Sequence, residues 1–158
     1  MADTDRLSEV TLDETGLPAP TPEIEQERRV AIFDLLESNR FRLEDAAAPG
    51  PYHLTLGVTD GRLGMQLVGD NGNAAGSLQL SLAPFRQIVK DYFRICDSYF
   101  DAVRRLPPAA IEAIDTGRRS IHDQGSLLLL ERLDGRVETD LATARRLFTL
   151  ICVLHYRG

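Results

Sequence analysis

Residues 52–82 read YHLTLGVTDGRLGMQLVGDNGNAAGSLQLSL, and this stretch decides the fold class. Large aliphatic residues alternate with small or polar residues in three runs, and the turn sequences Asp60-Gly61 and Asp70-Asn-Gly-Asn73 separate the runs. A period of two is typical of strands, and such turns join antiparallel neighbours. The stretch therefore predicts a three-stranded antiparallel meander with one aliphatic and one polar face.

Outside this stretch the apolar pattern becomes helical. Thr21-Pro22, followed by several glutamates, is a typical helix start, and this first helix is expected to end at Ser38-Asn39. From Phe85 to Leu106, apolar residues recur at spacings of three and four, which favours a long amphipathic helix. Two more helices are expected over residues 108–133 and 141–156. Gly117 and Gly125 in the first of these indicate close backbone approach or a break near Gly117.

The expected fold class is α+β, with an N-terminal helix, the three-stranded antiparallel meander, and three C-terminal helices packed on one face of the sheet. The helix that starts near Phe85 is expected to cover the aliphatic face of the meander along its whole apolar stripe. Residues 22–158 are expected to form a single α+β domain. Residues 1–21 are acidic and rich in proline and are expected to be a flexible arm, in which residues 6–13 could form a short edge strand.

Composition excludes some classes of function. The chain has 158 residues, of which 43% are hydrophobic, and a net charge of −6 that is concentrated in its first 45 residues. Nucleic-acid binding is not expected, because neutralising phosphates requires a basic face. No apolar run is long enough to span a bilayer, and the N-terminus lacks a signal-like apolar segment. A cytoplasmic location with no membrane role is therefore expected.

Recognisable motifs for cofactors and metals are missing. The glycines between residues 57 and 76 lie in strands and turns and lack the lysine and hydroxyl residue of a phosphate-binding loop. The three histidines show no short ligand spacing. Neither a cofactor nor a metal ion is expected, and Cys96 and Cys152 are expected to be buried, reduced thiols.

Candidate site residues gather in the stretch from Asp115 to Ser126. Two neighbouring arginines and a histidine there would suit a carboxylate or phosphate, and His122 titrates near neutral pH. Two further arginines lie in the first turns of the last helix, where the helix dipole does not explain them, so they could complete an arginine-lined pocket. The candidate ligand-binding set is Arg118, Arg119, His122, Ser126, Arg145 and Arg146.

The same residues also have a purely structural interpretation. Asp115 and Arg119 are spaced as an ion pair on one helix face, and His122 could be a hydrogen-bonded interior histidine. The face that carries Asp115, Arg119 and His122 continues into leucines one or two turns later. This placement at the mouth of a core is where ionisable groups have altered properties, but it does not identify their purpose.

Several segments together resemble a known family. Val30–Leu36, Pro84–Tyr92, Ala113–Ser126 and Ala144–Arg157 resemble the uncharacterised bacterial protein family UPF0262. The resemblance covers nearly the whole chain from about residue 6. It implies a compact, single-domain cytoplasmic bacterial protein, and it transfers no catalytic residue, substrate or partner.

Two functions remain open from the residues themselves. The first is a non-enzymatic binding or regulatory module that contacts a protein partner or a small anionic ligand. The alternative is a small hydrolase or transferase acting on an anionic substrate, with His122 as acid or base and Arg118 or Arg119 holding the anion. An enzyme requires a concave pocket in which His122 meets an ionisable group from another element, whereas a binding module would spread these groups over a convex face. The sequence leaves the oligomeric state open.

Overall fold

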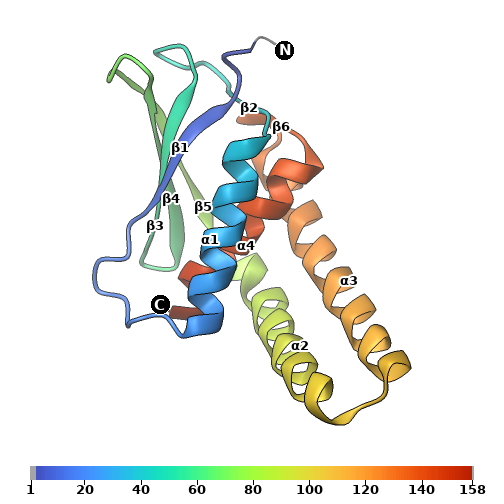
Figure 1. Ribbon diagram of the computed structural model, residues 1–158. Coiled ribbons are helices and arrows are strands. Elements are labelled where there is room, and N and C mark those ends of the chain that lie inside the picture. Colours follow the sequence, from blue (N-terminus) through green and yellow to red (C-terminus); the bar gives the residue numbers. More distant parts are fainter. Residues whose placement is uncertain (1–2, 158) are drawn as a thin grey trace.

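The computed structural model describes residues 3–157 and has an α+β fold (Figure 1). The first two residues of the expected arm lie outside this range. A 3-10 turn, Ala83–Phe85, precedes the second helix. The helices are α1 (Pro22–Glu37), α2 (Arg86–Arg105), α3 (Pro108–Leu133) and α4 (Leu141–Arg157), and the strands are β1 (Leu7–Leu12), β2 (Phe41–Leu43), β3 (Tyr52–Thr59), β4 (Arg62–Gly69), β5 (Ala74–Ser81) and β6 (Val137–Thr139).

The predicted meander is confirmed as β3, β4 and β5, which are antiparallel neighbours. The main sheet has four strands rather than the expected three, because β1 pairs in parallel with β3. The side chains of Leu7, Val10 and Leu12 are buried in the core. A shift in register between Leu7 and Glu9 interrupts the alternation of buried and exposed side chains in this strand. This irregularity explains why the sequence pattern predicts β1 only weakly.

Asn39 ties β1 to the end of α1. Its side-chain oxygen accepts a hydrogen bond from the Leu7 N–H at 2.7 Å, and its side-chain nitrogen donates to the Leu7 carbonyl at 3.0 Å and to the Leu35 carbonyl at 2.7 Å. One amide thus satisfies backbone groups of two elements. Residues 7–12 therefore belong to the sheet.

The aliphatic face of the sheet is covered by α4 together with α1, not by the length of α2. Phe148 and residues 150–154 of α4 are at most 1% exposed, and α4 contacts both α1 and β3. In α2 the buried side chains larger than alanine end at Cys96, midway along the helix, and Phe100 and Val103 are 45% and 52% exposed. The expectation that the whole apolar stripe of α2 lies on the sheet is therefore wrong.

The reason is that α2 and α3 form an antiparallel hairpin that projects beyond the sheet (Figure 1). The α2 stripe packs mainly against α3, and α3 in turn packs against α4. α3 runs without interruption through Gly117, so the alternative of a break at this residue is also wrong.

A second, two-stranded sheet joins the two halves of the chain. β2 pairs antiparallel with β6, and Arg42 of β2 forms ion pairs with Glu138 at 2.6 Å and Glu44 at 2.7 Å. The hydroxyl oxygen of Thr143, in the first turn of α4, accepts a hydrogen bond from the Arg40 N–H at 3.0 Å. These contacts fix the start of α4 beside the end of α1.

Two further expectations from the sequence concern the cysteines and the absence of a membrane-spanning helix. Both cysteines are free and buried, as expected. Among residues 3–157, none of the helices combines the length and the apolar character needed to cross a bilayer.

Candidate functional site

A pocket of about 590 Å³ lies where the four helices meet. Five of the six candidate ligand-binding residues line it, and the sixth, Ser126, is buried beside His122. The lining residues are Gln26, Glu27, Val30, Ala31 and Asp34 of α1, Tyr92 of α2, Arg118, Arg119, His122 and Asp123 of α3, and Arg145, Arg146 and Thr149 of α4.

The α3 side of the pocket is basic. Arg118 donates to Asp115 through both Nε, at 3.0 Å, and a terminal nitrogen, at 2.7 Å. Arg119 lies 3.1 Å from the other oxygen of the same carboxylate. The Arg118 hydrogen bond is the main reason that the pKa of Asp115 is lowered. One carboxylate thus serves two guanidinium groups, which leaves one positive charge in excess.

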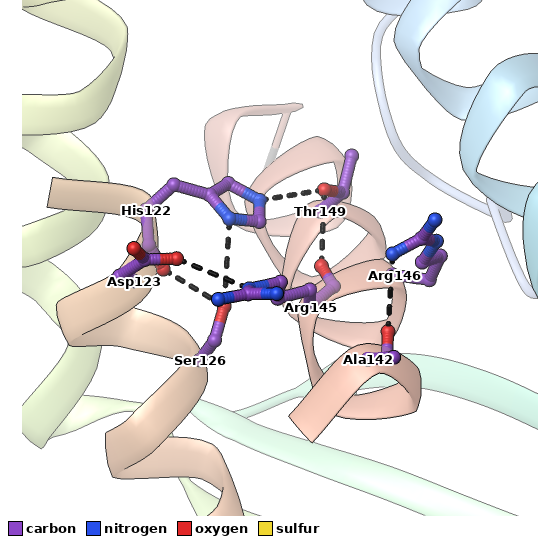
Figure 2. A network of polar contacts seen from close by, with 7 residues as sticks. All are labelled: His122, Asp123, Ser126, Ala142, Arg145, Arg146 and Thr149. Atoms are coloured by element: carbon purple, nitrogen blue, oxygen red, sulfur yellow. Dashed lines mark hydrogen bonds and ion pairs between the residues drawn. The ribbon is translucent and has the colours of Figure 1, made fainter. Parts of the chain in front are cut away.

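The α4 side adds two arginines that point in different directions. Arg145 reaches toward α3, where its Nε lies 3.1 Å from a carboxylate oxygen of Asp123 (Figure 2). Arg146 points away from α3, and its hydrogen bond is to the backbone carbonyl of Ala142 at 3.3 Å. Within the described residues Arg146 has no ion pair with a carboxylate, so it adds a second unbalanced positive charge to the pocket.

Both nitrogens of the His122 ring face side-chain hydroxyl groups (Figure 2). Its Nε2 lies 2.8 Å from the hydroxyl oxygen of Thr149, and its Nδ1 lies 3.4 Å from that of Ser126. The Thr149 hydroxyl donates to the Arg145 carbonyl at 3.2 Å, so its oxygen is left to accept from Nε2–H. These distances favour the tautomer with the proton on Nε2.

The surroundings of His122 keep the ring neutral. Its pKa is lowered to about 4, chiefly by burial; the positive charges of Arg118, Arg145 and Arg146 contribute to the shift, and Asp123 opposes it. The ring also packs against Tyr92 and Phe148, with centroids 5.3 and 5.1 Å away. A neutral ring that is fixed by the Nε2–Thr149 hydrogen bond and by packing against two aromatic rings helps to hold the pocket wall in place.

Small residues of α3 allow this close packing. Ser126 is fully buried, and Gly125 is also buried, where the ring of Phe148 occupies the space that a side chain would need. The Ser126 hydroxyl donates to the His122 carbonyl at 2.8 Å, so this buried hydroxyl has a partner on its own helix. The two glycines of α3 thus reflect the expected close approach, at Gly125 above all.

The α1 side of the pocket was not predicted from the sequence. Glu27 and Asp34 face the arginines, with Val30 and Ala31 between them. The Tyr92 hydroxyl donates to one oxygen of Glu27 at 3.3 Å, and burial is the main cause of a raised Glu27 pKa. The spacing of these four residues places them on one helix face, which was the available signal. Glu27 also fits the acidic first turns of a helix, and that explanation concealed its burial.

The pocket is concave and brings His122 together with ionisable groups from other helices, so its shape meets the criterion stated above for an enzyme rather than that for a convex binding face. It lacks a metal site in the described part of the chain, where no three histidine, cysteine, aspartate or glutamate side chains come together. The thiol of Cys96 lies outside the pocket lining, and burial raises its pKa to about 11. The chemistry of the pocket is therefore that of guanidinium and carboxylate groups.

Comparison with known proteins places the chain in a family. The sequence profile of the Uncharacterised protein family (UPF0262) matches residues 4–157. The chain belongs to this family. A UPF0262 protein of Roseobacter denitrificans is 58% identical over 157 residues, which cover 97% of this chain and 99% of the relative. A UPF0262 protein of Jannaschia sp. is 59% identical over 151 residues, covering 95% and 97%. No solved structure matches the chain.

Proposed function

We propose that this UPF0262 protein is a cytoplasmic binding module whose four-helix pocket takes a small molecule through an anionic group. The observation that carries the proposal is Arg146, which lines the pocket beside Arg145 and lacks an ion pair with any carboxylate of residues 3–157. A guanidinium presents a planar fork of donors that matches a carboxylate or phosphate.

The charges of the basic walls support an anion. Arg118 and Arg119 share one carboxylate, and Arg145 has one of its own. Like charges in a partly desolvated site repel one another, so an anion that contacts them stabilises the folded state. A volume of about 590 Å³ lies within the usual range for small-molecule pockets. The concave shape favours such a ligand over a protein partner.

His122 favours a binding role over an enzymatic one. A general acid or base works best with a pKa near the working pH, and the pKa of His122 is about 4. Its Nε2 is engaged with Thr149, a neighbour on α4, rather than directed at a bound molecule. We propose that His122 holds α3 and α4 in their relative positions at the pocket wall.

The proposal is tested by thermal unfolding with phosphate, sulfate or citrate against chloride at matched ionic strength. We expect the anions to raise the Tm of the wild type by several degrees at millimolar concentration and to have little effect on Arg146→Gln. Arg94→Gln is the matched control, because it removes the same charge from an exposed position on α2 outside the pocket. Equal shifts in all three proteins would contradict the proposal.

A further inference from the structure

The two sides of the pocket carry opposite charges. Glu27 and Asp34 lie two turns apart on the α1 wall, and neither forms an ion pair within residues 3–157. The arginines lie on the α3 and α4 walls opposite. After Asp115 and Asp123 are taken into account, two positive charges face two carboxylates, and the ion-pair distances do not connect them across the pocket.

Glu27, on the acidic wall, has a carboxylate oxygen without a hydrogen-bond donor. Its Oε1 accepts the hydrogen bond from Tyr92, but its Oε2 is shielded from water and has no donor among the described residues. A buried carboxylate oxygen without a donor is costly, and natural structures rarely leave one unsatisfied. A cationic nitrogen in the pocket beside Glu27 would compensate the charge of this poorly solvated carboxylate.

A simple anion would satisfy only half of this site. It would neutralise the arginines, but it would also add negative charge across from Glu27 and Asp34, where repulsion in a partly buried pocket is strong. A molecule with a positive group at one end and a negative group at the other would satisfy both walls. Between the acids, Val30 and Ala31 offer an apolar surface for the carbon chain that joins the two groups.

We infer that the pocket binds a small zwitterion, whose carboxylate or phosphate contacts Arg145 and Arg146 and whose ammonium group lies against the acidic α1 wall formed by Glu27 and Asp34. This inference rests on the proposed function and specifies its ligand class. Burial of Glu27 raises its pKa, and an ammonium group beside it would favour the ionised carboxylate.

The experiment is calorimetric titration at neutral pH and fixed ionic strength with two matched pairs of probes. O-phosphoethanolamine is compared with ethyl phosphate, and 4-aminobutanoate with butanoate, so that each pair differs in the amine. We expect at least one zwitterion to bind ten or more times more tightly than its amine-free partner. The pair with the larger ratio distinguishes a phosphate from a carboxylate ligand.

Variants of the acidic wall separate the two proposals. Glu27→Gln should bring the affinity ratio of each pair close to one without weakening the amine-free probe. Asp34→Asn should do the same, and it serves as a second variant in case Glu27→Gln disturbs folding. Glu37→Gln, on the exposed end of α1, should keep the ratio of the wild type. Arg146→Gln should weaken both members of each pair.

The anion pocket and the zwitterion ligand are contradicted by different results. Measurable binding of the amine-free probes with a ratio near one would overturn the zwitterion and leave the anion pocket intact. Failure of all four probes to bind, together with no thermal shift by anions, would overturn the proposed function and the inference with it.

Discussion

Gly125 of α3 lies directly against the ring of Phe148 of α4, and a Cβ atom at position 125 would overlap three carbons of that ring. The same ring packs edge-on against His122, with centroids 5.1 Å apart. The separation of α3 and α4, and with it the position of the pocket histidine, therefore depends on the absence of a side chain at residue 125.

Gly125→Ala should destabilise the fold by roughly 1–3 kcal/mol, because overpacking must displace Phe148 despite the better helix propensity of alanine. Gly117→Ala in the same helix is the matched control. Its new Cβ would lie 2.9 Å from Cδ1 of Ile95, the end of a flexible side chain, so its stability should be unchanged or slightly higher. Urea unfolding measures both, and equal losses would contradict the packing argument.

His122 should make the fold sensitive to mild acid. Its pKa is about 4 in the folded protein and about 6.5 when unfolded, so the unfolded state binds the proton first as the pH falls. The stabilisation is complete above pH 6.5 and is lost between about pH 6.5 and 4, by about 3 kcal/mol from this residue. Denaturant titrations across this range should show a shallower loss for His122→Gln than for the wild type. Parallel curves would exclude the buried neutral histidine.

Glu27 should act in the opposite direction. Its raised pKa means that the folded state prefers the protonated carboxyl, so the stabilisation present at low pH is lost as the pH rises through the folded pKa. Glu27→Gln should therefore be at least as stable as the ligand-free wild type at pH 7, and its advantage should shrink toward pH 4. Glu37→Gln should show no such pH-dependent difference. If Glu27→Gln were less stable than the wild type at pH 7 but equally stable at pH 4, the assignment would be wrong.

The two phenylalanines at the ends of the α2 stripe should respond very differently to truncation. Phe85 is fully buried, and Phe85→Ala should cost roughly 3–5 kcal/mol through the cavity it leaves. Phe100 is 45% exposed on the projecting hairpin, and Phe100→Ala should cost less than about 1 kcal/mol. Comparable losses in urea unfolding would mean that the end of the hairpin is covered in solution.

These phenylalanines also show what the periodicity of apolar residues can predict and what it cannot. The stripe from Phe85 to Leu106 correctly predicts a helix, since its spacing follows from the helical repeat. It cannot identify the surface that buries the stripe, because any apolar neighbour produces the same pattern. The partner of α2 is chiefly another helix, and the cover of the sheet is α4, whose apolar residues surround the helix almost completely.

The pocket was predictable on one side only. Arg118, Arg119 and His122 lie close together on one helix. Arg145 and Arg146 lie in the first turns of another helix, where the helix dipole does not favour arginine. Both observations can be made from the local sequence, and together they predict an arginine-lined pocket. Glu27 satisfies a local rule of its own as an acid near a helix start. Its burial depends on Tyr92, 65 residues away in the sequence, and no local pattern carries that information.

The position of α4 in the chain has a consequence for biosynthesis. Strands β1, β3, β4 and β5 leave the ribosome well before residue 141, yet their aliphatic face is closed largely by the helix that begins there. A nascent chain therefore carries an uncovered apolar sheet until the last helix has been translated, and such surfaces attract chaperones and aggregate. A chain truncated before Leu141 should be insoluble, even though it contains every strand of the main sheet.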